Sequence, residues 1–310
     1  MNSSEPRDHH YAPQFYLRNF AVDAERKKIA TVAKNGSRLI WSVRSIETLG
    51  FERDFYVHYG EGAPVSVETT INRRIETPIS RSDTWRKIAE GRSDSLDHSD
   101  RSVLYALVRH FKARTPHALQ TSLELIEMAA DPNSKIPFTD EERTMYAAIR
   151  ARPGGAKAFM NLMAANMLWS REEFESCGLW VLRSPIPLRA STTPVLTISA
   201  PSNPALSMPL PGMTPYVDML PLDPCTLVIL ALGNFDGAFS NTMMSVDEAR
   251  YYNRHFIGQL QHFDPIRHVI TGREGLSEEM AWAGYEKLAE SDQKMVFRLR
   301  EMAEALAPDA

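Results

Sequence analysis

The chain has 310 residues, 43% of them hydrophobic and 24% charged, which indicates a globular protein of one large or two modest domains that buries a core. A formal net charge of -4 gives no overall attraction to nucleic acid or anionic membranes, although it leaves room for a local basic groove. The two cysteines are isolated, which fits a reducing compartment. The N-terminus is polar and lacks the apolar core of a signal peptide, and no run approaches the ~20 apolar residues of a membrane span. These features predict a cytoplasmic protein without membrane contacts.

The chain opens with a segment rich in large amphipathic side chains, residues 9–20 (HHYAPQFYLRNF). Chain ends are loose unless something holds them, so this density of aromatic and hydrogen-bonding groups predicts that the segment docks into the fold. We expect residues 10–20 to be ordered and largely buried against the helical middle of the chain, with Tyr11, Phe15 and Phe20 in apolar contact.

A β-hairpin is predicted next. Residues 28–33 and 39–43 read as two short strands, and the Asn35-Gly36 pair between them is a strong hairpin signal. Residues 55–57 are a candidate third strand.

The middle of the chain is predicted to be helical. Apolar residues recur at four-residue spacing in a helix that Pro78 ends or kinks: Val67, Ile71, Ile75 and Ile79. A second apolar stripe predicts a helix that Ser99 or Asp100 caps and Pro116 interrupts: Val103, Leu104, Leu107, Val108 and Phe111. Further helices are expected over residues 83–90, 119–130, 145–149 and 156–168, and a Thr139-x-x-Glu142 capping box precedes the third of them.

The second half combines short strands, prolines and helices. Strands are predicted over residues 178–183, 195–198 and 226–231, and the prolines between them suit loops and strand ends. Helices are predicted over residues 246–261 and 277–306, of which the second is long and amphipathic.

The order of these elements predicts an α+β fold: an N-terminal β-hairpin region, a helical middle, a second β-rich segment and C-terminal helices. We expect the second β-rich segment to join the hairpin in one sheet. We also expect one domain over residues 1–310, with its core at 9–270 and a C-terminal helical extension at 276–310.

The opening segment resembles the start of the bacterial domain-of-unknown-function 4238 family, whose members begin His-Tyr-Val-Pro-Gln/Arg-Phe-Tyr-Leu-Arg-x-Phe. Residues 10–20 match this pattern except at Ala12, where valine is usual. Individually weaker landmarks follow in the family's order and extend the similarity over residues 9–270: Phe55-Tyr56, Glu68, Glu76, Arg114-Thr115-Pro116, Leu220-Pro221-Leu222 and Asn253. The resemblance implies a shared pocket and no known reaction.

One position departs from the family. Where members often carry Thr-Ser-Asp-Asn-Pro-Val, residues 190–195 read ASTTPV, so Thr192 stands in place of the aspartate. If that aspartate serves as a base or a metal ligand in the family, this chain lacks the group.

His10 is the strongest catalytic candidate, because histidine titrates near neutral pH and suits general acid–base work. The alternative is a packed, hydrogen-bonded anchor. Gln14 and Arg18, in the same segment, are candidates for substrate binding, or are structural, with Arg18 paired to Glu76.

His110 and Arg114 lie four residues apart, so they share one face at the end of their helix. An imidazole beside a guanidinium can bind a phosphate or a carboxylate, and Arg114 is therefore a candidate anion clamp and His110 a candidate substrate-binding residue. The alternative is a surface pair that suits the negative end of the helix dipole. Asn253, one of the landmarks that the resemblance implies, completes the candidate substrate-binding residues.

Glu68 and Glu76 lie on one side of the helix that follows the hairpin. Eight residues separate them by about 12 Å along the axis, too far to act together as a paired acid and base or on one metal. Glu76 is still a candidate base or metal ligand with residues from elsewhere, and the alternative is a solvated face that pairs with Arg73 or other cations.

Several familiar motifs are missing from the sequence. It has no Walker or dinucleotide-binding glycine motif, no nucleophile elbow, no His-Glu-x-x-His and no zinc-binding spacing of cysteine and histidine. We therefore assign no metal ligand and identify no cofactor. The basic string 109–114 can touch nucleic-acid phosphates or can be ordinary surface.

Two functions remain open. One is a hydrolase of phosphodiesterase or nuclease type, acting on a phosphate-containing or other anionic substrate, with His10, Glu76 and Arg114 as catalytic residues. The other is a non-catalytic ligand-binding or protein-interaction module, in which the same residues form a structural polar network. An open cleft beside these residues favours the enzyme, whereas a sealed network favours the module.

Overall fold

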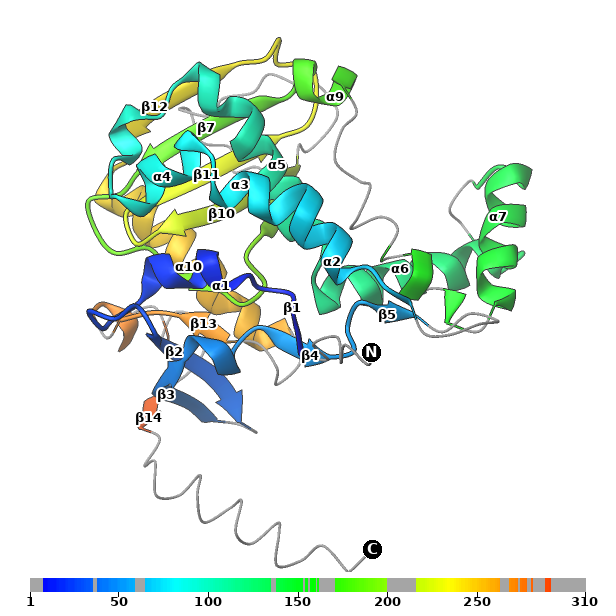
Figure 1. Ribbon diagram of the computed structural model, residues 1–310, viewed down its shortest axis with the longest axis horizontal. Coiled ribbons are helices and arrows are strands. Elements are labelled where there is room, and N and C mark those ends of the chain that lie inside the picture. Colours follow the sequence, from blue (N-terminus) through cyan, green and yellow to red (C-terminus); the bar gives the residue numbers. More distant parts are fainter. Residues whose placement is uncertain are drawn as a thin grey trace, which may run out of the picture.

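The computed structural model describes residues 8–35, 38–58, 65–134, 138–152, 154–155, 157–159, 161, 171–199, 216–262, 268–272, 274–277, 280 and 288–290. Within these ranges, helices pack on two five-stranded sheets, which confirms the α+β class (Figure 1). Two short strand pairs complete the pairing: β1 (Asp8–His10) with β4 (Phe51–Arg53), and β5 (Val57–His58) with β6 (Val65–Ser66). No helix in the described ranges has both the length and the apolar character that crossing a bilayer requires.

The first sheet comes from the second half of the chain and has the order β12–β7–β11–β10–β9. Its strands are β7 (Gly178–Arg183), β9 (Leu196–Ser199), β10 (Tyr216–Asp223), β11 (Thr226–Ala231) and β12 (Phe239–Met243). Alternate residues of a strand face opposite sides. Leu220 and Val228 therefore pack in the core with α5 (Arg101–Ala113), whereas Met219 and Ile229 pack with α10 (Val246–His262).

The second sheet has the order β14–β3–β2–β13–β8. Its strands are β2 (Lys28–Asn35), β3 (Arg38–Ser45), β8 (Ala190–Ser191), β13 (His268–Ile270) and β14 (Leu288–Glu290). The antiparallel register of β2 and β3 ends with Asn35 opposite Arg38, so the predicted hairpin is confirmed.

The expectation that the second β-rich segment joins the hairpin sheet is wrong for most of that segment. Only β8 reaches the hairpin sheet, through β13, whereas β7 and β9–β12 pair among themselves. The reason is burial, because every residue of β11 is buried. A strand that is apolar on both faces needs cover on both sides, and α5 and α10 supply it in a separate sheet.

The predicted C-terminal helix over residues 277–306 is wrong at Leu288–Glu290. These residues form β14, which pairs in parallel with Leu39–Trp41 of β3. Without β14, β3 would be an edge strand with unpaired backbone groups, and β14 pairs with these groups. The remainder of 281–310, like most of the predicted helix over 156–168, lies outside the described residues.

The helical middle begins with an irregular run: α2 (Glu68–Ile71), a π-helical turn η3 (Asn72–Glu76) and α3 (Thr77–Ser80). In a regular α-helix, an apolar row at four-residue spacing drifts by about 40° at each step. The π turn has more residues per turn, so it keeps Ile71, Ile75 and Ile79 buried in one row. Pro78 does not end the run, because it lies in the first turn of α3, where a missing N–H is tolerated.

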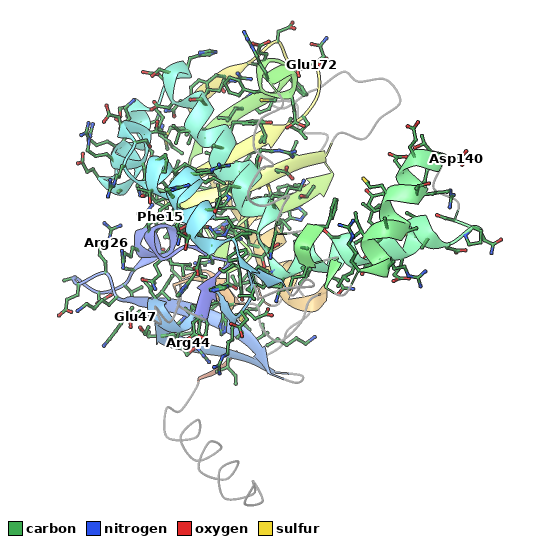
Figure 2. The ribbon with its side chains drawn as sticks, turned by 45° about the vertical axis from the view of Figure 1, so that its right-hand side comes forward. Phe15, Arg26, Arg44, Glu47, Asp140 and Glu172 are labelled. Atoms are coloured by element: carbon green, nitrogen blue, oxygen red, sulfur yellow. The ribbon has the colours of Figure 1, made fainter. Side chains whose placement is uncertain are left out.

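The next four helices follow the predicted order: α4 (Asp83–Ala89), α5, α6 (Pro116–Ala130) and α7 (Asp140–Ala151). The sequence did not predict α9 (Arg171–Ser176). Short 3-10 turns lie at η1 (Arg18–Phe20), η2 (Ile46–Thr48), η4 (Ser93–Ser95) and η5 (His98–Asp100). The capping box of Thr139 and Glu142 is confirmed. Helices α6 and α7 project from the body (Figure 1), with Asp140 far from Phe15 (Figure 2), and α7 buries no residue.

The opening segment docks as predicted. Tyr11, Tyr16 and Phe20 are buried, and helix α1 (Gln14–Leu17) holds Phe15 edge-on to Trp85 of α4, with ring centroids 4.8 Å apart. Gly50 makes this docking possible, because its carbonyl accepts hydrogen bonds from the backbone of residues 11 and 12. Gly50 has φ +65°, and a Cβ there would lie 2.5 Å from that of Ala12, so only glycine fits.

Phe15→Ala is expected to lower the free energy of unfolding by about 3 kcal/mol, the lower end of the range for core aromatics, because Phe15 is only partly buried. Urea unfolding measures the loss. Val22→Ala, at a position 57% exposed, is the control and is expected to change stability by less than about 0.5 kcal/mol. Equal effects of the two substitutions would contradict a docked segment.

Candidate functional site

The guanidinium of Arg114 lies buried where β1, the α2–α3 run and α5 meet. Its Nε donates to Tyr56 Oη at 2.8 Å. One terminal nitrogen lies 2.9 Å from Nε2 of His110 and forms an ion pair with Glu76, and the other donates to the backbone carbonyl of His10. With 1% of its surface exposed, Arg114 has a protein partner at each of its three nitrogens. We call these five residues the Arg114 network.

His9 and Glu68 extend the network on the side of Tyr56. Nδ1 of His9 accepts from the backbone N–H of Tyr56 at 2.9 Å, so the proton of a neutral ring is on Nε2, which lies 3.2 Å from Glu68 Oε2. The rings of His9 and Tyr56 stack with centroids 5.7 Å apart. Glu68 and Glu76 therefore act separately, each on its own cation or imidazole, as their spacing along the helix predicts.

His10 joins the network through its backbone, while its imidazole lies 5.7 Å from the Phe51 ring and 3.4 Å from Nε2 of Gln14. Burial lowers the pKa of His10, and a hydrogen bond with the backbone of Glu47 opposes this shift in part. Arg18 is exposed and donates to Gln14 Oε1 at 3.1 Å, so the alternative in which Arg18 pairs with Glu76 is wrong.

His110 is fully buried and neutral. Because Arg114 only donates hydrogen bonds, Nε2 of His110 accepts and Nδ1 carries the proton. That buried N–H has no hydrogen-bond partner within the described part of the chain. Burial lowers the pKa of His110 to about 3. The alternative of a surface pair at the helix end is therefore wrong for His110 and Arg114.

The network leaves little for a substrate to bind. The side chains exposed at its edge are the partly exposed imidazole of His10 and two carboxylates, since Glu68 and Glu76 have 17% and 16% of their side chains exposed. Across the described residues, no group of three or more histidine, cysteine, aspartate or glutamate side chains is arranged to hold a metal ion.

Asn253 and Thr192 lie apart from the network. Asn253 is on α10, which packs on the opposite face of the first sheet from α5, and its amide bonds the backbone of Arg189 and Pro187 at 2.7 and 3.0 Å. Thr192 is buried, and its hydroxyl accepts from the backbone N–H of His268 at 3.2 Å. Both side chains brace the backbone.

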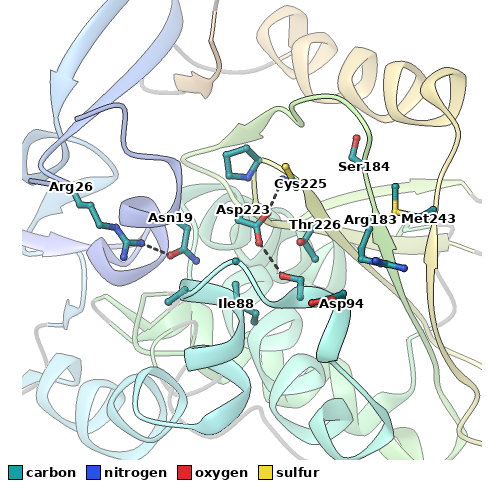
Figure 3. Close-up of a pocket in the computed structure, with 14 residues that line it drawn as sticks. Asn19, Arg26, Ile88, Asp94, Arg183, Ser184, Asp223, Cys225, Thr226 and Met243 are labelled. Carbon is teal, nitrogen blue, oxygen red and sulfur yellow. Dashed lines mark hydrogen bonds between the residues drawn. The ribbon is translucent and has the colours of Figure 1, made fainter. Parts of the chain in front are cut away.

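A cleft with a volume of about 560 Å³ lies between the opening segment and the first sheet (Figure 3). We call it the Asp223 cleft, after the carboxylate in its wall, which accepts hydrogen bonds from Ser93 Oγ at 3.2 Å and Cys225 N at 2.7 Å. Burial raises the pKa of Asp223. Figure 3 shows Arg26 and Arg183 at opposite ends of the cleft, with Asp223 between them.

The two arginines of the cleft differ in their partners. Arg26 donates to the backbone of Arg18 at 3.0 Å and to Asn19 Oδ1 at 2.8 Å. The guanidinium of Arg183 makes no hydrogen bond or ion pair with the described residues, although its Nε is buried. An unpaired buried donor costs about 1–3 kcal/mol, so Arg183 is poised to receive an acceptor from outside the chain.

No sequence pattern singled out His9, Arg183 or Asp223 as candidate site residues. Strand alternation could have pointed to His9. Neighbouring residues of β1 face opposite sides, so His9 and His10 cannot both face the core, and His9 is the more buried of the two. Asp223 directly follows the Leu220-Pro221-Leu222 landmark and closes β10. For Arg183, at the end of β7, no pattern in the sequence distinguishes it from the other arginines.

Arg114→Lys is expected to lower the free energy of unfolding by about 3 kcal/mol or more, because a lysine ammonium cannot serve the separate partners of a planar guanidinium. Chemical unfolding at pH 7 measures the loss. Arg150→Lys, at a side chain 54% exposed, is the matched control and is expected to be close to neutral. A neutral Arg114→Lys would contradict the network as drawn.

Stability is expected to fall as the pH falls from 7 to 5, in part through His110. Its pKa is about 3 in the folded chain against an ordinary 6.5, so the unfolded chain takes up the proton at a higher pH than the folded chain does. At pH 5 this protonation stabilises the unfolded chain by about 2 kcal/mol relative to the folded chain. In His110→Gln, the loss between pH 7 and 5 should shrink by about that amount, as measured by urea unfolding at both pH values. Burial also lowers the pKa of His268, to about 4, so His268 contributes to the same loss of stability between pH 7 and 5. The His110→Gln variant keeps this contribution.

A family model described as "Protein of unknown function (DUF4238)" matches residues 8–233. No curated protein and no solved structure matches the chain. The match covers well over half of the sequence and includes the opening segment, the Arg114 network and most of the residues of the Asp223 cleft. The chain belongs to the DUF4238 family of proteins of unknown function.

Proposed function

We propose that the protein is a non-catalytic module that binds a small organic anion in the Asp223 cleft. In this proposal the Arg114 network is structural, and it holds the opening segment in place as one wall of the cleft. Asn19 of that segment lines the cleft and donates to the backbone of Leu222 at 3.0 Å, which joins the wall to β10.

The observation that carries the proposal is the unpaired guanidinium of Arg183. A guanidinium recognises a carboxylate or a phosphate through paired N–H donors. Asp223 adds a second recognition element, because a carboxylate in the wall can accept a hydrogen bond from a hydroxyl or amine of the ligand. A volume of about 560 Å³ is within the usual range of small-molecule pockets, about 300–1,000 Å³.

The hydrolase alternative has weaker support. A catalytic anion clamp must reach its substrate, whereas Arg114 is buried with all three nitrogens engaged. His10 and Glu76 connect to Arg114 through a backbone carbonyl and an ion pair, and no described pocket is lined by these residues.

A nucleic-acid partner also has weaker support, because acidic groups neutralise the basic string 109–114. Arg109 pairs with Glu173 at 3.2 Å, and Lys112 pairs with Asp218 at 2.7 Å. With Arg114 buried as well, the string leaves no row of free cations for a phosphate backbone.

Arg183→Ala is expected to weaken binding in the cleft about 10–100-fold, the value of one charge-assisted hydrogen-bonding group. The probes are succinate, citrate and inorganic phosphate, measured by calorimetric titration of the full chain. Native mass spectrometry of gently purified protein adds a second readout, since a bound species of the wild type should be lost from Arg183→Ala. Arg171→Ala, at a side chain 90% exposed, is the control.

Two results would overturn the proposal. One is equal binding of every probe by the wild type and Arg183→Ala. The other is a hydrolytic activity on a phosphodiester that disappears in His10→Ala and persists in Arg183→Ala, which would favour the enzyme instead.

A further inference from the structure

A second cavity lies beside α10, and its lining shares no residue with the Asp223 cleft. Three arginines line it: Arg189, from the loop before β8, and Arg250 and Arg254, from α10. The cavity has a volume of about 100 Å³, which suits one small anionic group and is well below the pockets that hold larger ligands.

The helix brings two of these cations together. Arg250 and Arg254 are four residues apart, so they share one face of α10. Arg250 is 53% exposed, and its contact within the helix is a long 3.9 Å approach to Asp247. Such an exposed pair contributes little, so it leaves the guanidinium available at the mouth of the cavity.

Asn253, between those two arginines in the chain, fixes the third. Its Oδ1 accepts from the backbone N–H of Arg189 at 2.7 Å, and its Nδ2 donates to the carbonyl of Pro187 at 3.0 Å. Arg189 is 2% exposed and also donates to the backbone carbonyl of Glu274. The buried cation is therefore held rigidly, which lowers the entropic cost of binding.

Charge indicates what the cavity takes. The charged residues that line it are three arginines and one glutamate, the exposed Glu274. An excess of cationic side chains around one cavity favours an anionic ligand. Planar guanidinium donors match the oxygens of a tetrahedral phosphate in pairs.

We propose that Arg189, Arg250 and Arg254 form a binding site for a phosphate group, with Asn253 as the positioning residue. The group is either free inorganic phosphate or the terminal phosphate of a monoester, whose organic part extends past Arg250 into solvent. This site is independent of the one proposed in the Asp223 cleft, and either can fail without the other.

The test measures phosphate and phenyl phosphate binding to the full chain by calorimetry, at constant ionic strength set with chloride. The wild type is expected to bind phosphate, and Arg250→Ala and Arg254→Ala are each expected to weaken binding about tenfold or more. Arg150→Ala, with a side chain 54% exposed on α7, matches the exposure of Arg250 and should bind as the wild type does. Tighter binding of phenyl phosphate than of phosphate identifies a monoester as the ligand, and the reverse identifies the free anion.

Arg189→Lys keeps the buried charge and removes the planar donors, so it should weaken binding while circular dichroism shows the native fold. If Arg189→Lys does not fold, the variants at 250 and 254 decide alone. Equal affinity of the wild type, Arg250→Ala and Arg254→Ala overturns the site, as does an absence of phosphate binding by the wild type.

Discussion

The fold depends on the cost of burying one permanent positive charge. A buried guanidinium needs hydrogen-bond acceptors and a counter-ion, so the chain must surround Arg114 with both. It does so with His110 of the same helix and with groups from three other segments: Tyr56, Glu76 and the carbonyl of His10. Each of these segments is thereby fixed relative to α5, and with them the opening segment and the wall of the Asp223 cleft.

The same constraint explains the irregular helix that carries Glu76. The π turn at Asn72–Glu76 keeps the isoleucine row facing the core and, at its last residue, presents a carboxylate to Arg114. π turns often occur at functional positions. Here the turn carries the ion pair of Glu76 and Arg114, and the arginines of the two cavities lie elsewhere, at Arg183 and around α10.

Local patterns were enough to predict much of the fold: the hairpin at Asn35, the helices α4 to α7 and three strands of the first sheet, β7, β9 and β11. They did not predict β10 and β12 of the same sheet. Periodicity and turn chemistry act within a few residues, so they are visible in the sequence. The division of the strands into two sheets was not visible in the sequence, because it depends on which other elements cover the two faces of β11. A polar network of His10, Glu76 and Arg114 was one of the two alternatives that the sequence left open, but the sequence alone could not distinguish His9 from His10 or show that Arg183 lacks a partner among the described residues.

The opening segment also has a consequence for synthesis on the ribosome. His10 leaves the exit tunnel 104 residues before Arg114, its anchor, and at about 5–20 residues per second the delay is about 5–20 s. During that time the aromatic-rich opening segment cannot make its contact with Arg114. Chaperones that bind exposed aromatic segments therefore have a defined interval in which to act on the nascent chain.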